Sequence, residues 1–111
     1  MRLLVLTMLL WATACGADEA LDCTLGEFSK VYGGLQWQVR GCSDGQSVIV
    51  MTVAGNPADP YFFLLRPAGD KVAVAAQGSG DASAAAPARA ELERMLARDL
   101  LILVRGLATS K

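Results

Sequence analysis

Histidine is absent from this chain of 111 residues, and aromatic residues make up only 6% of it. Without histidine the chain lacks the usual general base near neutral pH and the commonest side-chain metal ligand. Histidine-dependent catalytic triads and histidine-ligated metal sites are therefore excluded, and we expect no metal and no cofactor. An excess of either charge is also missing, because 10 Lys and Arg stand against 11 Asp and Glu. Nucleic-acid binding normally needs clustered basic residues, so we expect no nucleic-acid partner.

Hydrophobic residues are abundant, at 53% of the chain, and they begin with a nearly continuous run at residues 3–11. Arg2 precedes this run and small residues follow it, which is typical of a secretory signal peptide. About nine apolar residues are too few to cross a bilayer as a helix. We predict a signal peptide at 1–14, an acidic tether at 15–22, one domain at 23–107 and a C-terminal tail at 108–111.

The end of the signal segment, Ala12-Thr13-Ala14-Cys15, resembles the lipobox of bacterial lipoproteins, which usually carries Leu where Ala12 stands. This resemblance covers the signal region alone. It implies cleavage before Cys15, thioether attachment of diacylglycerol to Cys15 and acylation of the new N-terminus. Because Gly16 rather than Asp follows the cysteine, it also implies passage to the outer membrane. The same residues fit an ordinary A-x-A cleavage site, which would release a soluble periplasmic protein; the lipoprotein route is the one we predict.

The number of cysteines supports that route. Three cysteines in an exported protein leave an odd thiol in an oxidising compartment. Acylation of Cys15 removes it and leaves Cys23 and Cys42 to form a disulfide, which would add about 3 kcal/mol to the free energy of unfolding. The alternative is that Cys23 and Cys42 are buried free thiols.

The first element of the domain is predicted to be a short helix over residues 25–32. Thr24 and Glu27 have the spacing of a capping box, in which each side chain accepts a hydrogen bond from a backbone N–H near the helix start. Apolar side chains follow at helical spacing, at Leu25, Phe28 and Tyr32. The pair Gly33-Gly34 is a suitable helix end.

Four strands are expected next, over residues 35–40, 47–53, 61–66 and 71–77. The first alternates cleanly, so we place Trp37 in the core with its apolar neighbours at i±2. The second and third are apolar on both faces, as central strands are. Short turns rich in Gly, Pro, Asn and Asp separate the strands, and such short connections enforce an antiparallel meander.

A long helix over residues 84–104 is predicted to follow, because Ala, Leu, Glu and Arg dominate and an apolar stripe recurs at helical spacing. Asp81 or Ser83 is the candidate N-cap, and Gly106 is the expected end. The apolar run Leu100–Val104 would also suit a fifth strand, but no turn residue precedes it, and we keep it helical.

The predicted fold class is therefore α+β: a four-stranded antiparallel meander with the long C-terminal helix packed on one face and a short N-terminal helix. A sheet face left uncovered would be a candidate binding surface, unless the short helix covers it. The residues that we assign to this candidate binding face are Gln36, Gln38, Arg40, Tyr61 and Phe63.

The sequence matches known catalytic, nucleotide-binding and metal-binding motifs only in part. Residues 41–45 match the G-x-S-x-G pattern of hydrolases, but the general base is missing and a hairpin turn explains them. Gly78-Ser79-Gly80 lacks the third glycine of a dinucleotide loop. The acids Asp18, Glu19 and Asp22 lack the spacing of a calcium loop. The last helix carries a mild basic stripe of Arg94, Arg98 and Arg105, for which a solvated helix face is the default and an anionic envelope component is the candidate partner.

These observations favour a small, lipid-anchored envelope protein that acts by binding, as an adaptor, inhibitor, immunity protein or assembly factor, and not as an enzyme. We expect it on the periplasmic side of a bacterial membrane, with an envelope protein as its partner. One alternative is a periplasmic carrier of a small lipid or glycan. Another is an enzyme that uses two carboxylates, for which the candidate acids are Asp44, Asp59 and Asp70.

Overall fold

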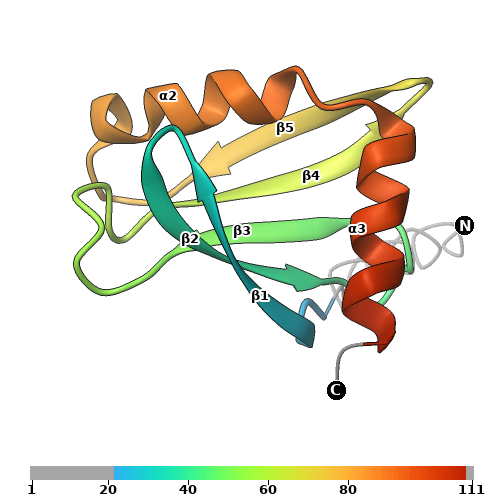
Figure 1. Ribbon diagram of the computed structural model, residues 1–111. Helices are drawn as coiled ribbons and strands as arrows, with labels where there is room; N and C mark the ends of the chain where they lie inside the picture. Colours follow the sequence, from blue (N-terminus) through green and yellow to red (C-terminus); the bar gives the residue numbers. More distant parts are fainter. Residues whose placement is uncertain (1–21, 110–111) are drawn as a thin grey trace, which may run out of the picture.

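A computed structural model describes residues 22–109, which form one antiparallel sheet and two helices (Figure 1). The strands are β1 (Leu25–Tyr32), β2 (Leu35–Gly41), β3 (Val48–Thr52), β4 (Phe62–Ala68) and β5 (Lys71–Gln77), and the helices are α2 (Ala82–Glu93) and α3 (Ala97–Thr109). Because the strands lie in the order β1-β2-β3-β4-β5, the sheet is a simple meander. The α+β class and the antiparallel meander are confirmed, but the sheet has five strands instead of four.

The segment predicted as a helix at 25–32 is the additional strand, β1. Gly33 and Gly34 do not end a helix: both have positive φ, +60° and +80°, and they form the two-residue turn that pairs Tyr32 with Leu35 of β2. The capping box is also absent, since Thr24 donates its hydroxyl to Asp22 Oδ1 and Glu27 accepts from the side chain of Gln38.

A β-bulge explains why β1 has the apolar spacing of a helix. Leu25 pairs with Gly41 and Phe28 pairs with Val39, so Gly26 and Glu27 together face one residue of β2. The bulge therefore brings two residues three positions apart onto the same face of the sheet, as one helical turn would do. A Cβ at Gly26 would collide with the backbone of Leu107, which is why the bulge carries glycine.

The four predicted strands are confirmed, as is the core position of Trp37. Cross-strand pairs place Val39 beside Val50 and Val50 beside Phe63, and all three side chains are fully buried. The Trp37 ring packs on Phe63 with centroids 5.4 Å apart, and its Nε1 donates a 3.1 Å hydrogen bond to the carbonyl of Tyr32. These residues define the inner face of the sheet.

Both helices cover this inner face. Leu92 of α2 and Leu100 and Leu107 of α3 are fully buried in the same cluster as Trp37 and Phe63. In Figure 1, α2 lies beside β5 and the β1–β2 turn, and α3 crosses the strands near their ends. The helix α2 contacts both edge strands, β1 and β5, so the sheet curls around the core. Across residues 22–109, neither helix has the length and apolarity that a membrane-spanning segment requires.

The single helix predicted at 84–104 is two helices. Between them Leu96 forms a bridge with Lys71, and the N–H of Ala97 donates a 3.0 Å hydrogen bond to the carbonyl of Asp70. The turn between β4 and β5 thus forms hydrogen bonds with backbone groups that would otherwise be paired within a continuous helix. The run Leu100–Val104 is helical, as predicted, and Asp81 is the N-cap of α2.

The end of α3 also differs from the prediction. Gly106 lies within the helix, which runs to Thr109 and so includes residues assigned to the C-terminal tail. The predicted signal peptide, Cys15 and the tether up to residue 21 lie outside the described residues.

Candidate functional site: the open face of the sheet

The face of the sheet opposite the helices carries a group of large apolar side chains. Ile49 of β3 pairs with Leu64 of β4, and Met51 pairs with Phe62, so the four side chains are contiguous across the two strands. We call them the apolar strip and call this side of the sheet the open face. All four are only partly buried. Within residues 22–109 both helices lie on the other side, so neither covers the strip.

Polar side chains of β2 form one border of the apolar strip. Gln38 pairs with Met51 and Arg40 pairs with Ile49, so both point to the open face. Glu27 of β1 accepts a 2.6 Å hydrogen bond from Gln38 Nε2, and its Oε1 lies 3.7 Å from Arg40 Nη2. Exposed contacts of this kind contribute little to stability. They do hold the two long side chains of β2 in a defined position beside the strip.

The five residues predicted as a binding face do not share one face. Gln36, Gln38 and Arg40 lie together on the open face, as expected from the alternation of β2. Phe63, in contrast, is fully buried on the inner face, and Tyr61 packs edge-to-face against it at 5.6 Å. Phe63 is therefore inaccessible to a partner, whereas Tyr61 is only partly buried.

The error in β4 has a simple cause. Residues 62–65 are all large and apolar, so alternation gives no information about which side chains point to the helices. The pairing of Val50 with Phe63 settles the question and turns Phe62 and Leu64 outward. Sequence reasoning missed the apolar strip for this reason. The signal that could have identified the strip was the inward position of Trp37. Once the strand pairing is known, an inward Trp37 determines which side chains of β3 and β4 point toward the helices and which point to the open face.

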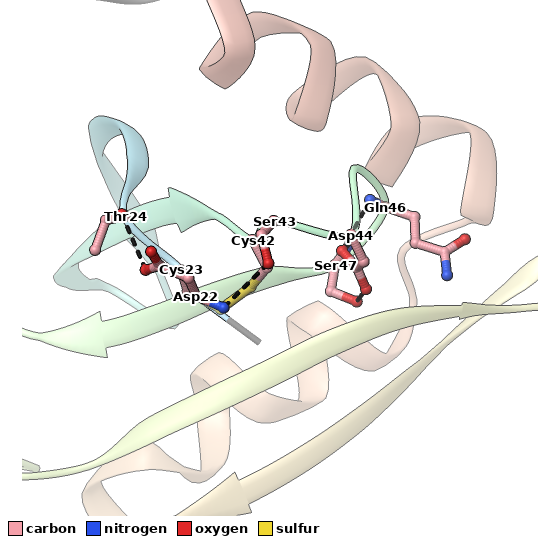
Figure 2. The surroundings of a disulfide bond; sticks show 8 residues. All are labelled: Asp22, Cys23, Thr24, Cys42, Ser43, Asp44, Gln46 and Ser47. Carbon is pink, nitrogen blue, oxygen red and sulfur yellow. Dashed lines mark hydrogen bonds between the residues drawn. A yellow bond between two sulfur atoms is a disulfide. The ribbon is translucent and has the colours of Figure 1, made fainter. Parts of the chain in front are cut away.

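A disulfide between Cys23 and Cys42, confirmed as predicted, joins the start of the domain to the end of β2 (Figure 2). Asp22 and Ser43 reinforce it with two hydrogen bonds: Ser43 N donates to the carbonyl of Asp22 at 2.6 Å, and Asp22 N donates to Ser43 Oγ at 3.1 Å. The point at which the described chain begins is thereby fixed to the loop between β2 and β3.

The G-x-S-x-G segment forms this loop, and its acid has a structural role. Asp44 accepts hydrogen bonds from the N–H groups of Gln46 and Ser47 and from the Ser47 hydroxyl (Figure 2). Partial burial on its own would raise the pKa of Asp44. The hydrogen bonds from Ser47 and Gln46, with Arg66 nearby, outweigh burial and lower this pKa below its ordinary value.

The candidate catalytic acids are dispersed. Asp44 precedes β3 and Asp59 follows it, so the length of the strand separates them. Asp59 accepts a 2.6 Å hydrogen bond from Thr52 Oγ1, and Asp70 lies in the β4–β5 turn. Among residues 22–109, no group of three or more His, Cys, Asp or Glu side chains is placed to hold a metal ion. Of the proposed calcium ligands, Asp18 and Glu19 lie outside the described residues.

An open depression of about 330 Å³ adjoins one end of the apolar strip. Its lining includes Met51 and Phe62 of the strip, together with Tyr61 and the Asp59-Pro60 segment. The Gly78-Ser79-Gly80 turn contributes Gly78 and Ser79 to the same depression. A Cβ at Gly80 would collide with the carbonyl of Ala58, so this glycine is needed for the close approach of two loops.

Comparison of the chain with protein-family models, with curated proteins and with solved structures finds no match.

Proposed function

We propose that the protein is a small, exported, lipid-anchored envelope protein that acts by binding an envelope protein through its open face, and not by catalysis. Anchoring would occur through Cys15, in keeping with the lipobox-like residues before it. The Cys23–Cys42 disulfide supports an oxidising compartment, because such bonds persist mainly in exported proteins. The partner would make this protein an adaptor, an inhibitor, an immunity protein or an assembly factor.

The observation that carries this proposal is the apolar strip on the side of the sheet away from both helices. An apolar centre with a polar border is the usual composition of a protein interface. Here Gln38 and Arg40 supply one such border. The strands β3 and β4 each have a hydrogen-bonded neighbour on both sides, so the strip is rigid before any partner arrives. A rigid surface loses little conformational entropy on binding.

A carrier of small lipids or glycans receives less support. The depression beside Met51 and Phe62, at about 330 Å³, is at the lower end of the range of small-molecule sites and is open to solvent. We therefore place the binding site on the sheet face and treat ligand carriage as the alternative outcome of the experiment.

In-cell photo-crosslinking tests the proposal. A photo-reactive residue replaces Arg66, which extends from β4 on the open face next to the strip, and in a matched control it replaces the exposed Ala90 of α2. We expect one stoichiometric protein adduct from position 66 and none from position 90. Adding Met51→Glu to the position-66 chain should lower the adduct by roughly tenfold or more, because a buried carboxylate would face the partner.

Two results would overturn the assignment. Recovery of the chain without a protein adduct from position 66 would favour a small-ligand carrier. Equal protein adducts from both positions would show that the partner does not bind preferentially at the open face. Circular dichroism and an intact disulfide must show that Met51→Glu still folds. Intact-mass analysis tests the anchor separately, since a mature chain that begins at unmodified Cys15 would refute lipidation.

A further inference from the structure

The solvent side of α3 carries apolar side chains between two arginines. Leu101, Ile102 and Arg105 follow Arg98 by three, four and seven residues, which places all four on one side of a helix. Leu100, Val104 and Leu107 occupy the opposite side and are buried in the core. Yet Leu101 is 42% exposed and Ile102 is 66% exposed, and Ile102 is the most exposed of the large hydrophobic side chains in residues 22–109. We call these four residues the α3 ridge.

Open depressions flank the ridge on both sides. One, of about 300 Å³, is lined by Ala97, Arg98, Leu100 and Leu101 of the helix together with Gln46 and Pro67. The other, of about 250 Å³, is lined by Asp99, Ile102 and Leu103 together with Met95, Lys30 and Tyr32. Two cationic side chains, Arg98 and Lys30, and the carboxylate of Asp99 thus lie beside the two exposed apolar side chains. This combination of exposed apolar and cationic side chains is complementary to a lipid bilayer, which has an apolar interior beneath an anionic headgroup layer.

The described chain begins close to this helix. Asp22 is hydrogen-bonded to Ser43, and Gly41 lies near the Leu107 side chain at the C-terminal end of α3. Residues 15–22 span at most about 25 Å when fully extended, and the 13 residues of α3 are about 20 Å long. An anchor at Cys15 therefore holds the helix within reach of a bilayer surface.

We propose that the α3 ridge rests on the anionic lipid surface of the membrane to which Cys15 is anchored; the inference rests on the lipid anchor of the proposed function. Leu101 and Ile102 enter the boundary between headgroups and acyl chains, and Arg98 binds lipid phosphate. Because α3 and the open face lie on opposite sides of the sheet, this contact turns the apolar strip away from the membrane. A protein partner can then reach the strip from the aqueous side.

The full chain, purified from membranes, is reconstituted into vesicles of phosphatidylcholine with or without phosphatidylglycerol. A photo-reactive residue stands at Ile102 or, in the control, at the exposed Gln36 of the open face. With phosphatidylglycerol we expect roughly tenfold more lipid adduct at position 102 than at position 36, and a lower yield in phosphatidylcholine alone. Arg98→Glu should lower the adduct at 102 by roughly tenfold, whereas the matched reversal Arg40→Glu should leave it unchanged.

Failure of the ridge and failure of the anchor give different results. If Cys15 is lipid-modified, three results would refute the membrane contact of the ridge and leave the anchor intact. These are no lipid adduct at position 102, equal lipid adducts at positions 102 and 36, and a protein adduct at position 102 in cells. An unmodified Cys15 with the expected adduct at 102 would refute the anchor and leave the ridge as a membrane contact in its own right.

Discussion

Val50 and Met51 are neighbours in β3, and the sheet gives them opposite surroundings. Val50 is fully buried beneath the helices, whereas Met51 is only partly buried on the open face. The same contrast holds for Phe63 and Phe62 in β4. Apolar residues that alternate along one strand therefore have different roles: the inner set holds the helices to the sheet, and the outer set forms the surface through which we propose that a partner binds. Substitutions on the inner face should reduce stability, and those on the open face should mainly reduce binding.

Truncating one phenylalanine on each face gives the strongest test of this contrast. Phe63→Ala leaves a cavity next to Trp37 and should lower the free energy of unfolding by about 4 kcal/mol. Phe62→Ala removes a partly exposed ring and should cost less than about 2 kcal/mol. Equilibrium urea unfolding of the two variants measures both values. Equal losses would mean that the open face is packed as tightly as the core.

Removing the disulfide should have the next largest effect. Replacing both Cys23 and Cys42 by serine removes a cross-link and so raises the conformational entropy of the unfolded chain. It should lower the free energy of unfolding by about 3 kcal/mol. Both faces should weaken alike, because the bond acts mainly on the unfolded state. Unfolding of the wild-type chain under reductant supplies the control. A loss close to zero would show that the hydrogen bonds between Asp22 and Ser43 suffice to hold this end of the domain.

Two adjacent glycines test how closely α2 covers the inner face. A Cβ at Gly33 would collide with the backbone of Ala88, whereas at Gly34 it would meet open space. Both residues have positive φ, so alanine is strained at either position. We expect Gly33→Ala to cost more than about 2 kcal/mol and Gly34→Ala about 1 kcal/mol in thermal or urea unfolding. A larger loss at Gly34 would contradict the close packing of the β1–β2 turn on α2.

The smallest expected effect is a pH dependence at Asp44. Its pKa is lowered in the folded state, so the folded chain binds a proton less readily than the unfolded chain. The stability that this carboxylate contributes is therefore present above the ordinary pKa of aspartate and is lost as the pH falls through the lower, folded value. Because Asp44 is exposed, the contribution is about 0.5 kcal/mol or less.

Unfolding of wild type and Asp44→Asn across the acid range measures this contribution as the difference between their pH profiles. The two curves should converge at low pH and separate above the ordinary pKa of aspartate. Parallel curves throughout would show that the hydrogen bonds of the β2–β3 loop do not depend on the ionised form of Asp44.

Much of the sheet could be predicted from local pattern. Clean alternation around Trp37 placed its side chain in the core, and short turns required antiparallel neighbours. The same local reasoning failed in β1, because a bulge at Gly26 gave a strand the apolar spacing of a helix. The stronger signal in that segment was the Gly33-Gly34 pair, which suits a two-residue hairpin turn better than a helix end.

The division of the last helix and the location of the site depend on contacts between distant residues. Nothing between Arg94 and Leu96 ends a helix by its own propensity; the interruption comes from the bridge to Lys71. Similarly, the apolar run in β4 fits either orientation, and only pairing with β3 turns Phe62 and Leu64 to the open face. Local pattern thus predicted that an apolar face would exist without showing which residues form it.

The irregularities of the two edge strands bear on solubility. A regular strand edge offers unpaired N–H and C=O groups to which a second sheet can add, and this is a common route to aggregation. In this sheet β1 is interrupted by a bulge and carries Lys30 on its helix-covered side, while β5 begins with the bridge from Lys71 to Leu96. The β1 edge is thus interrupted by the bulge, and the first residue of the β5 edge is already paired. Both features disfavour edge-to-edge joining of copies of the chain into a growing sheet.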